Sequence, residues 1–348
     1  MLDAAVPLLA DGGIGSYGLE IKTVIAAFVV GVVVGITGMG GGALMTPALI
    51  FLGVGDASTV VTADLTAAAV YKSGGAVVHW REGSPNLHMA GWLIVGSVPT
   101  AFLGPHLVGW VAPEADLDNF LKLCIGFALL FAATTYALRL YIQLRRRAAG
   151  VYQSASSDPE VRPVPTMLVG ALGGLLVGIT SVGSGSVIMI ALLMLYPALS
   201  AVRLVGTDLV QAVPLVLSAA VSNIIAHGLD WGITIPLIIG SVPGTIIGAK
   251  IAPRVPQSVI RRGIVIVLTI SGLALLDKAG WGPLGAGEDE THPIFIGLVG
   301  VALLVLVPLV WGLLRRQVGL PAFGTPTVAE IEDPESARDH ADRSNPVP

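Results

Sequence analysis

Long apolar runs separated by short polar stretches make up most of this chain. The apolar segments lie at about 21–53, 58–79, 88–112, 119–141, 164–197, 200–226, 231–252, 259–277 and 293–314. A run of about 20 apolar residues can cross the roughly 30 Å hydrocarbon core of a bilayer as a helix. The runs are continuous and do not alternate with a period of two, so they predict helices and not the strands of a barrel. The pattern therefore predicts an all-α polytopic membrane protein.

The pattern of the first half returns in the second half. Residues 34–42 (VGITGMGGG) recur as 177–185 (VGITSVGSG), and the Gly-Ser-Val-Pro sequence at 96–99 recurs unchanged at 240–243. Between these motifs, an Asp-Leu pair beside a threonine occurs in both halves. All copies are offset by 143 or 144 positions. A duplicated and mostly apolar unit of this size is typical of transporters whose site lies between two repeats.

The glycine-rich copies interrupt segments that are too long for one straight span. Ile21 to Gly53 would form a helix of about 50 Å, which exceeds the bilayer, whereas Ala43 to Gly53 alone would be about 16 Å long and too short to cross. A helical hairpin with its glycine tip inside the protein fits both lengths. We therefore predict two repeats, each a Gly-tipped helical hairpin plus three transmembrane helices, with one extra C-terminal span.

The charges between the segments favour an inverted arrangement of the repeats. Lys and Arg mark cytoplasmic loops near span ends, and basic clusters occur at 145–147, 250–262 and 315–316, whereas 114–118 and 288–290 are acidic. If every segment crossed once, one basic cluster would lie outside. If each hairpin returns to its own side, the repeats are inverted and every basic cluster falls inside.

This arrangement divides the chain into six parts. They are an extracytoplasmic leader at 1–20, the first membrane unit at 21–141, a cytoplasmic linker at 142–163, the second membrane unit at 164–278, the extra transmembrane helix at 293–314 and a disordered cytoplasmic tail at 315–348.

Composition supports a membrane location and excludes several classes of function. Charged residues make up 12% of the chain, against about 25% in an average soluble domain. The net charge of −4, without a basic tract, argues against nucleic acid as a partner. The single cysteine, Cys124, offers neither a disulfide nor a thiolate metal site. No His/Glu metal spacing and no nucleophile with a nearby base is evident, so we expect neither an enzyme nor a cofactor.

The two glycine tips are the candidate substrate site. In an inverted pair the tips meet near the midplane, and the short helices after them direct free N–H groups at that place. Helix N-termini beside glycines bind anions. The alternative is that the glycines only permit close helix packing, but three consecutive glycines disfavour a helix too strongly for that role alone. The candidate substrate-binding residues at the tips are Thr37, Gly40, Gly41, Gly42, Thr180, Gly183, Ser184, Gly185 and Ser186.

Among the ionisable residues within the apolar segments, two carboxylates and one lysine are functional candidates. Asp64 and Asp208 occupy corresponding positions, and an ionisable residue within the membrane is a functional candidate. Each could accept the proton of a coupled transporter or could support the hairpin tip. Lys72 follows Asp64 by eight residues and could attract an anion. Alternatively, it pairs with Asp64 or extends to the cytoplasmic side.

Small residues recur every four positions in the two Gly-Ser-Val-Pro segments. They are Gly96, Thr100 and Gly104 in the first copy and Gly240, Gly244 and Gly248 in the second. This spacing predicts closely packed helices.

At these motifs the chain resembles the sulfite exporter TauE/SafE family, also called the 4-toluene sulfonate uptake permeases. The resemblance rests on the glycine-rich residues 38–42, their weaker copy at 181–185 and the two Gly-Ser-Val-Pro segments, and it covers about 24–278. It implies secondary transport of sulfite, organosulfonates or related small anions across a bacterial inner membrane, coupled to protons. The chain departs from the family pattern in its extra span and its acidic tail.

The sequence thus predicts a multi-pass inner-membrane transporter of a small sulfur-containing anion, working by alternating access between the two tips. Its expected partners are the anion, protons and the lipid bilayer. An anion channel of the same architecture and a membrane scaffold subunit are the alternatives. The sequence does not determine the oligomeric state, the anion or the direction of transport.

Overall fold

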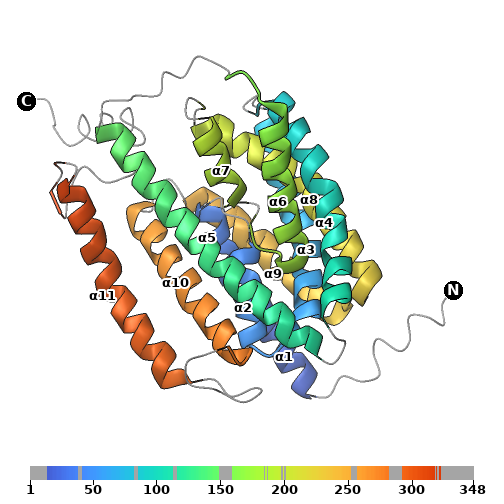
Figure 1. Cartoon of the computed structure of the whole chain (residues 1–348). Helices are drawn as coiled ribbons and strands as arrows, with labels where there is room; N and C mark the ends of the chain where they lie inside the picture. The colour runs from blue at the N-terminus through green and yellow to red at the C-terminus, as the bar shows by residue number, and fades with distance from the viewer. Residues whose placement is uncertain are drawn as a thin grey trace, which may run out of the picture.

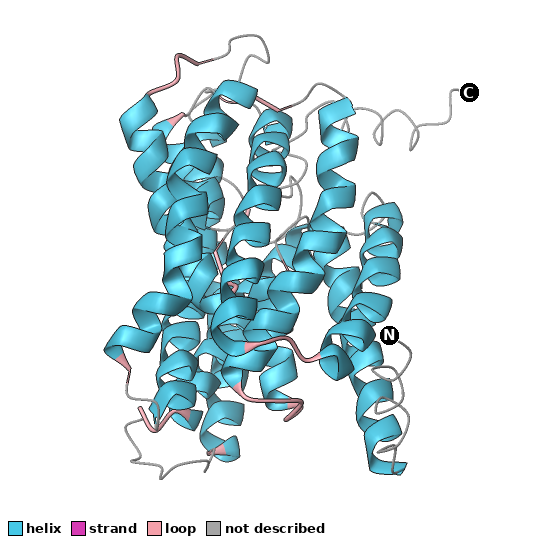
Figure 2. Cartoon of the chain, turned by 90° about the vertical axis from the view of Figure 1, so that its right-hand side faces the viewer, coloured by secondary structure: helices cyan, strands magenta, loops and turns pink. Residues whose placement is uncertain are grey.

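The computed structural model of the chain describes residues 14–37, 41–81, 85–112, 116–148, 159–183, 185, 187–196, 199, 201–251, 257–281, 292–317, 319 and 321–322. The described residues form helices and short loops, with no strand among them (Figure 2). In chain order the helices are α1 (Ile14–Thr37), α2 (Gly42–Phe51), α3 (Ala57–Arg81), α4 (Leu87–Val111), α5 (Leu117–Ala148), α6 (Pro163–Thr180), α7 (Val187–Leu195), α8 (Ala201–His227), α9 (Trp231–Ile251), α10 (Gln257–Lys278) and α11 (Pro293–Gln317). The all-α fold class is therefore confirmed.

Each predicted hairpin consists of a long helix followed by a short one. Helix α1 has 24 residues and α2 has 10, whereas α6 has 18 and α7 has 9. At 1.5 Å per residue, α2 and α7 are about 15 Å long and too short to cross a bilayer. In Figure 1, α1 and α2 occupy the lower part of the bundle, and α6 and α7 occupy the upper part.

The short helices start about where the glycine motifs predict. The first helix starts before the predicted end of the leader. The short helices begin at Gly42 and Val187, close to the ends of the glycine-rich copies at 34–42 and 177–185. Helix α1 begins at Ile14, so the last part of the predicted leader is helical. The rest of the leader, most of the linker and nearly all of the tail lie outside the described residues.

The two halves pack against each other with exchanged partners. Helix α1 lies along α9, and α4 lies along α6 (Figure 1). By the sequence repeat, α6 and α9 are the second-half counterparts of α1 and α4. Helices α3 and α8, which are also counterparts, pack together, as do α5 and α10. Exchanging the two halves therefore turns the α1–α9 contact into the α4–α6 contact and leaves the α3–α8 and α5–α10 contacts as they are.

Glycine makes the closest of these contacts. A Cβ at Gly104 in α4 would lie 3.0 Å from the carbonyl carbon of Gly178 in α6. A Cβ at Gly244 in α9 would lie 3.1 Å from the backbone nitrogen of Val32 in α1. Both distances are shorter than ordinary contacts, so the helix backbones touch directly. The four-residue spacing of small residues is confirmed as a packing surface.

Six of the described helices are long and apolar enough to cross a membrane. They comprise Leu87–Val111, Leu117–Ile142, Pro163–Thr180, Arg203–His227, Trp231–Ile251 and Ile296–Gln317. The last of them belongs to α11, which lies on the outside of the bundle beside α10 (Figure 1) and corresponds to the predicted extra span. Its side chains are mostly exposed, with Ile294 79% and Leu298 65% exposed. Such a continuous apolar surface suits contact with lipid.

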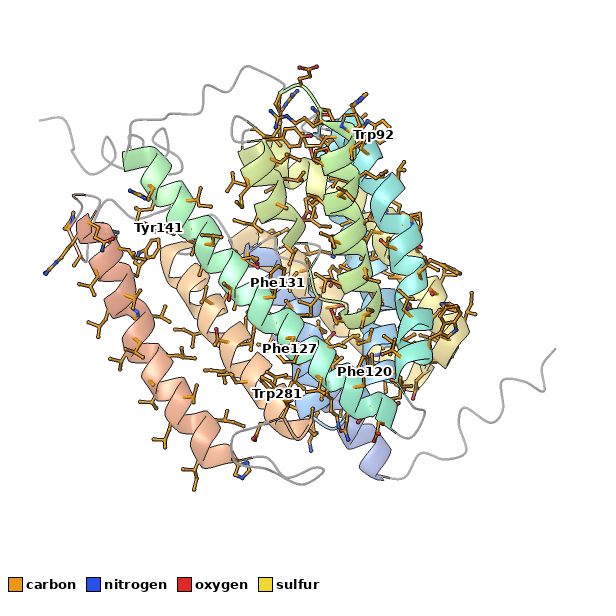
Figure 3. The ribbon with its side chains drawn as sticks, viewed as in Figure 1. Trp92, Phe120, Phe127, Phe131, Tyr141 and Trp281 are labelled. Carbon is orange, nitrogen blue, oxygen red and sulfur yellow. The ribbon has the colours of Figure 1, made fainter. Side chains whose placement is uncertain are left out.

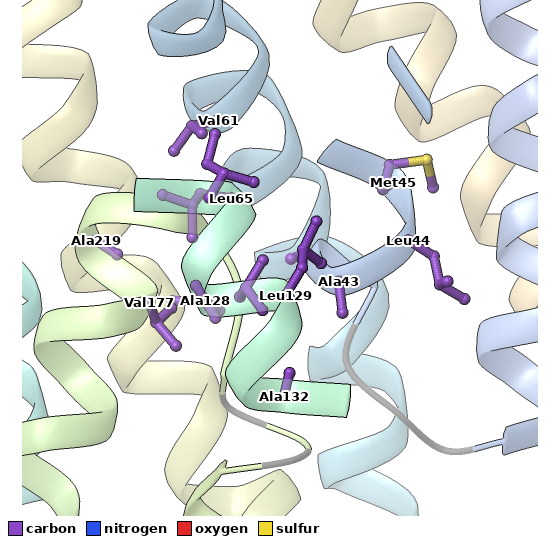
Figure 4. Close-up of a cluster of buried hydrophobic side chains, with 14 of the residues drawn as sticks. Ala43, Leu44, Met45, Val61, Leu65, Ala128, Leu129, Ala132, Val177 and Ala219 are labelled. Atoms are coloured by element: carbon purple, nitrogen blue, oxygen red, sulfur yellow. The ribbon is translucent and has the colours of Figure 1, made fainter. Parts of the chain in front are cut away.

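The hydrophobic core surrounds the hairpins. Figure 4 shows this core where α2, α3 and α5 converge, with Ala43, Leu65 and Leu129 all buried. Towards the outside, aromatic side chains follow α5, and the Phe127 ring meets Trp281 edge-on at 4.9 Å (Figure 3). The middle of the molecule is thus densely packed, and any polar group there has been taken out of water.

Candidate functional site

The two hairpin tips are in direct contact. The Cα of Gly42, at the start of α2, packs against the backbone carbonyl of Ser181, so that no Cβ would fit at position 42. Ser181 ends α6 in the left-handed conformation, with φ of 59°, a conformation that turns the chain away from the helix axis. Gly183 also has a positive φ, of 132°, which side chains disfavour. These residues turn the second tip towards the first.

Asp64 of α3 fastens both tips with one carboxylate oxygen. The Thr46 hydroxyl of α2 donates to Asp64 Oδ2 at 2.7 Å, and the Ser181 hydroxyl donates to the same oxygen at 2.8 Å. Asp64 is fully buried. Its second oxygen, Oδ1, has no hydrogen-bond partner among the described residues. One oxygen thus holds the two halves together, and the other is available for a proton or a ligand.

Lys72 is buried within electrostatic range of both carboxylates. Its side chain is buried, and its ammonium group interacts electrostatically with Asp208 and with Asp64. Asp208 of α8 is also buried and accepts a hydrogen bond from Gln211 Nε2 at 3.1 Å. The charges of both carboxylates therefore act on the Lys72 ammonium, and its pairing with Asp64 stays a prediction. A cation near two anions lowers the cost of burying all three.

The two short helices begin with backbone groups near this charged cluster. Gly41 is the N-cap of α2 and provides no side-chain cap. The first bonds of α2 are donated to the Gly41 carbonyl by the N–H groups of Leu44, at 2.9 Å, and Met45, at 2.8 Å. The Val187 N–H donates to the Gly183 carbonyl at 3.1 Å in the same way. The amides of Gly42 and Ala43, ahead of the bonds of α2, form the positive end of that helix.

The predicted threonines use their hydroxyls within their own helices. The Thr37 hydroxyl donates to the Val33 carbonyl at 2.8 Å, and the Thr180 hydroxyl donates to the Leu176 carbonyl at 2.7 Å. Thr180 also accepts from the Val182 N–H at 3.1 Å, which stabilises the turn at the second tip. Bonds of this type to the preceding turn are common for Thr in helices.

Other predicted residues fall into two groups. Gly41, Gly42, Gly183 and Gly185 lie at the tips, with Asp64, Lys72 and Asp208 in the adjoining charged cluster. Gly40, Ser184 and Ser186 lie outside the described residues.

Four residues of the site were not found by sequence reasoning. They are Thr46, Tyr71, Ser181 and Gln211. Two of them had a signal in the spacing. Tyr71 follows Asp64 by seven residues and Gln211 follows Asp208 by three, and both spacings place the pair on one helix face. Thr46 had no such signal, because its partner lies on another helix.

Among the described residues, no group of three or more His, Cys, Asp or Glu side chains could hold a metal ion. The cluster instead combines hydroxyls, carboxylates, one ammonium and the N-termini of two short helices. These groups can bind an anion and exchange a proton.

Apolar spanning helices around a buried charged cluster define a polytopic membrane protein with an internal polar site. Comparison with known proteins identifies the group to which it belongs. The model of the family described as "Sulfite exporter TauE/SafE" matches residues 23–275, and the chain belongs to this family.

Two curated relatives come from Bacillus subtilis (strain 168). The chain is 31% identical over 259 residues to a protein described as "Probable membrane transporter protein YjnA", which covers 74% of this chain and 100% of that protein. It is 28% identical over 255 residues to "Probable membrane transporter protein YdhB", which covers 73% of this chain and 98% of that protein. No solved structure matches the chain. The family and these relatives identify a membrane transporter.

Proposed function

We propose that this protein is a proton-coupled secondary transporter of a small sulfur-containing anion, such as sulfite or an organosulfonate. The anion class follows the family description, which names sulfite. In this proposal the anion binds where the two glycine tips meet, and the site opens alternately to the two sides of the inner membrane.

The contact of both tips with Asp64 is the observation that carries the proposal. The Thr46 and Ser181 hydroxyls come from different halves of the chain and donate to the same carboxylate oxygen. A change at this oxygen would therefore loosen the first hairpin, the second hairpin or both. A contact shared by both halves suits alternating access, in which the two halves move relative to each other around one site.

The charge balance of the cluster supports coupling to protons. If all three groups are ionised, Asp64, Asp208 and Lys72 together carry one negative charge, and an incoming anion would add to it. Like charges in a buried site repel strongly. A proton that binds with the anion would cancel the added charge. The unpartnered Oδ1 of Asp64 gives that proton a place that does not disturb the bonds at Oδ2.

The inverted orientation of the repeats is part of the proposal. Helices α5 and α11 run in the same direction in Figure 1, so their ends lie on one side of the bundle. Asp118 lies in the first turn of α5, and Arg315 and Arg316 lie in the last turn of α11. We assign the basic side, with the 142–163 linker and the 315–348 tail, to the cytoplasm, and the 1–20 leader to the opposite side.

Uptake into proteoliposomes tests the substrate class. The purified protein would be reconstituted and offered sulfite, thiosulfate, methanesulfonate and acetate under identical conditions. We expect the sulfur oxyanions to enter faster than in protein-free liposomes, and acetate to show no such excess. Equal rates with and without protein for every sulfur oxyanion would contradict the proposal.

A further inference from the structure

Tyr71 carries a buried hydroxyl whose oxygen faces the backbone N–H of Gly41 and whose proton has no acceptor among the described residues. The residue is 8% exposed. A buried donor left unpaired destabilises the folded protein, and most such groups in proteins are paired. The Tyr71 hydroxyl is therefore expected to have a role that the protein's own side chains do not show.

The place of this hydroxyl points to an anion. It lies against Gly41, the N-cap of α2, at the position that a Cβ of Gly41 would occupy. The free amides at the start of α2 lie at the same tip, so an O–H donor and several N–H donors meet there. The next residue along α3 is Lys72, the buried cation of the cluster, and the charge of Asp64 acts on both side chains. Donors and a cation in one region suit the oxygens of an oxyanion that binds there.

The second half lacks this set of groups. At the 144-residue offset, Leu215 stands in place of Tyr71 and Val216 in place of Lys72, and both are buried. The second tip therefore has neither the hydroxyl nor the ammonium. The two halves fold alike but differ in what they offer a ligand.

We propose that Tyr71 is a specificity-determining residue that donates its hydroxyl proton to an oxygen of the transported oxyanion. The oxyanion head is held mainly by the first hairpin, by Tyr71, Lys72 and the start of α2, and not equally by both tips. This assignment rests on the proposed function and specifies how its site recognises the substrate.

Replacing Tyr71 by Phe removes the hydroxyl and keeps the ring. The probe is whichever of sulfite, thiosulfate and methanesulfonate binds the wild-type protein most tightly, with the Kd measured calorimetrically in detergent. A hydrogen bond to a charged group supports an expected rise in Kd of about tenfold or more in Tyr71→Phe. Without anion the thermal midpoint should change little, because the hydroxyl proton has no acceptor among the described residues and only the contact with the Gly41 N–H is lost.

Tyr196→Phe is the matched control. The Tyr196 hydroxyl accepts from the Arg162 N–H at 2.8 Å and bonds the Thr166 hydroxyl, so its loss should lower the thermal midpoint and leave the anion Kd unchanged. Tyr71→Phe should thus change the anion Kd, whereas Tyr196→Phe should change the thermal midpoint.

Gly41→Ala provides a second test, because its methyl group would displace the Tyr71 hydroxyl. It should raise the anion Kd in the wild-type protein and raise it less in the Tyr71→Phe background. A wild-type Kd in Tyr71→Phe, in a folded and monodisperse protein, would overturn the role of Tyr71 and leave the proposed function standing. If no sulfur oxyanion binds the wild-type protein, the proposed function fails, and this inference fails with it.

Discussion

Asp64 and Ser181 are 117 positions apart in the sequence, and a 2.8 Å hydrogen bond joins their side chains. Asp64 belongs to α3 in the first half, and Ser181 is the C-cap of α6, the first helix of the second hairpin. This bond joins the two halves where their tips meet, so we expect it to stabilise the resting arrangement and to change when the halves move relative to each other.

Removing this bond should destabilise the protein. In Ser181→Ala the bond to a buried carboxylate is lost, and the free energy of unfolding should fall by about 1.5–3 kcal/mol. Thr134→Val is the control, because the Thr134 hydroxyl is exposed and bonds only the carbonyl of its own helix. It should change stability by less than about 0.5 kcal/mol. Thermal unfolding in detergent measures the midpoint of each variant and of the wild-type protein. A Ser181→Ala midpoint equal to that of Thr134→Val would contradict the role of Ser181.

Asp64→Asn and Asp208→Asn separate coupling from support. An asparagine at position 64 keeps an oxygen that can accept from Thr46 and Ser181, but it cannot take up a proton. If either carboxylate carries the coupled proton, its Asn variant should still bind the anion and lose transport driven by a pH gradient. Full gradient-driven transport in both single variants and in the double variant would leave these residues only a structural role.

Lys72→Gln should weaken anion binding. The buried ammonium is the cation of the cluster, so its replacement by a neutral amide should raise the anion Kd by about tenfold or more. Lys250→Gln is the control, since Lys250 is exposed at the end of α9. Binding isotherms of the two purified variants give the comparison. An unchanged Kd in Lys72→Gln would remove the ammonium from the site.

The topology can be tested by labelling a single cysteine in intact cells. In a Cys124→Ser background, a cysteine introduced at Ser156 lies in the proposed cytoplasmic linker. It should resist a membrane-impermeant thiol reagent added outside and react after the cells are opened. Reaction in intact cells would contradict the inverted arrangement of the repeats.

The sequence was sufficient to predict the helices, the repeat and the charged residues of the site. Apolar length determines the spans, and an ionisable residue such as Asp64 or Lys72 is conspicuous within them. The partners of these residues could not be read in the same way. Thr46 and Ser181 are ordinary hydroxyl residues in apolar surroundings, and only the packing of the two hairpins brings both to Asp64.

Thr37 and Thr180 show a second limit of prediction from the sequence. Their matched positions in the two glycine motifs suggest hydroxyl donors for a ligand, and this role stays a prediction. In the structure both hydroxyls donate to a carbonyl of the preceding turn, a bond that Thr commonly makes in helices. Sequence periodicity gives the helix face on which a residue lies, but it does not show which of several nearby acceptors its hydroxyl will bond.

Gradient-driven accumulation is the most direct test of the central claim, that an anion bound between the tips moves together with a proton. Liposomes containing the protein would be loaded at one pH and diluted into another, with thiosulfate or methanesulfonate as substrate, because neither anion crosses lipid readily as a neutral acid at these pH values. We predict accumulation above the equilibrium level in the wild-type protein and its loss in Asp64→Asn or Asp208→Asn. A flux that only equilibrates the anion, at the same rate with either pH gradient or none, would contradict the account and indicate a channel.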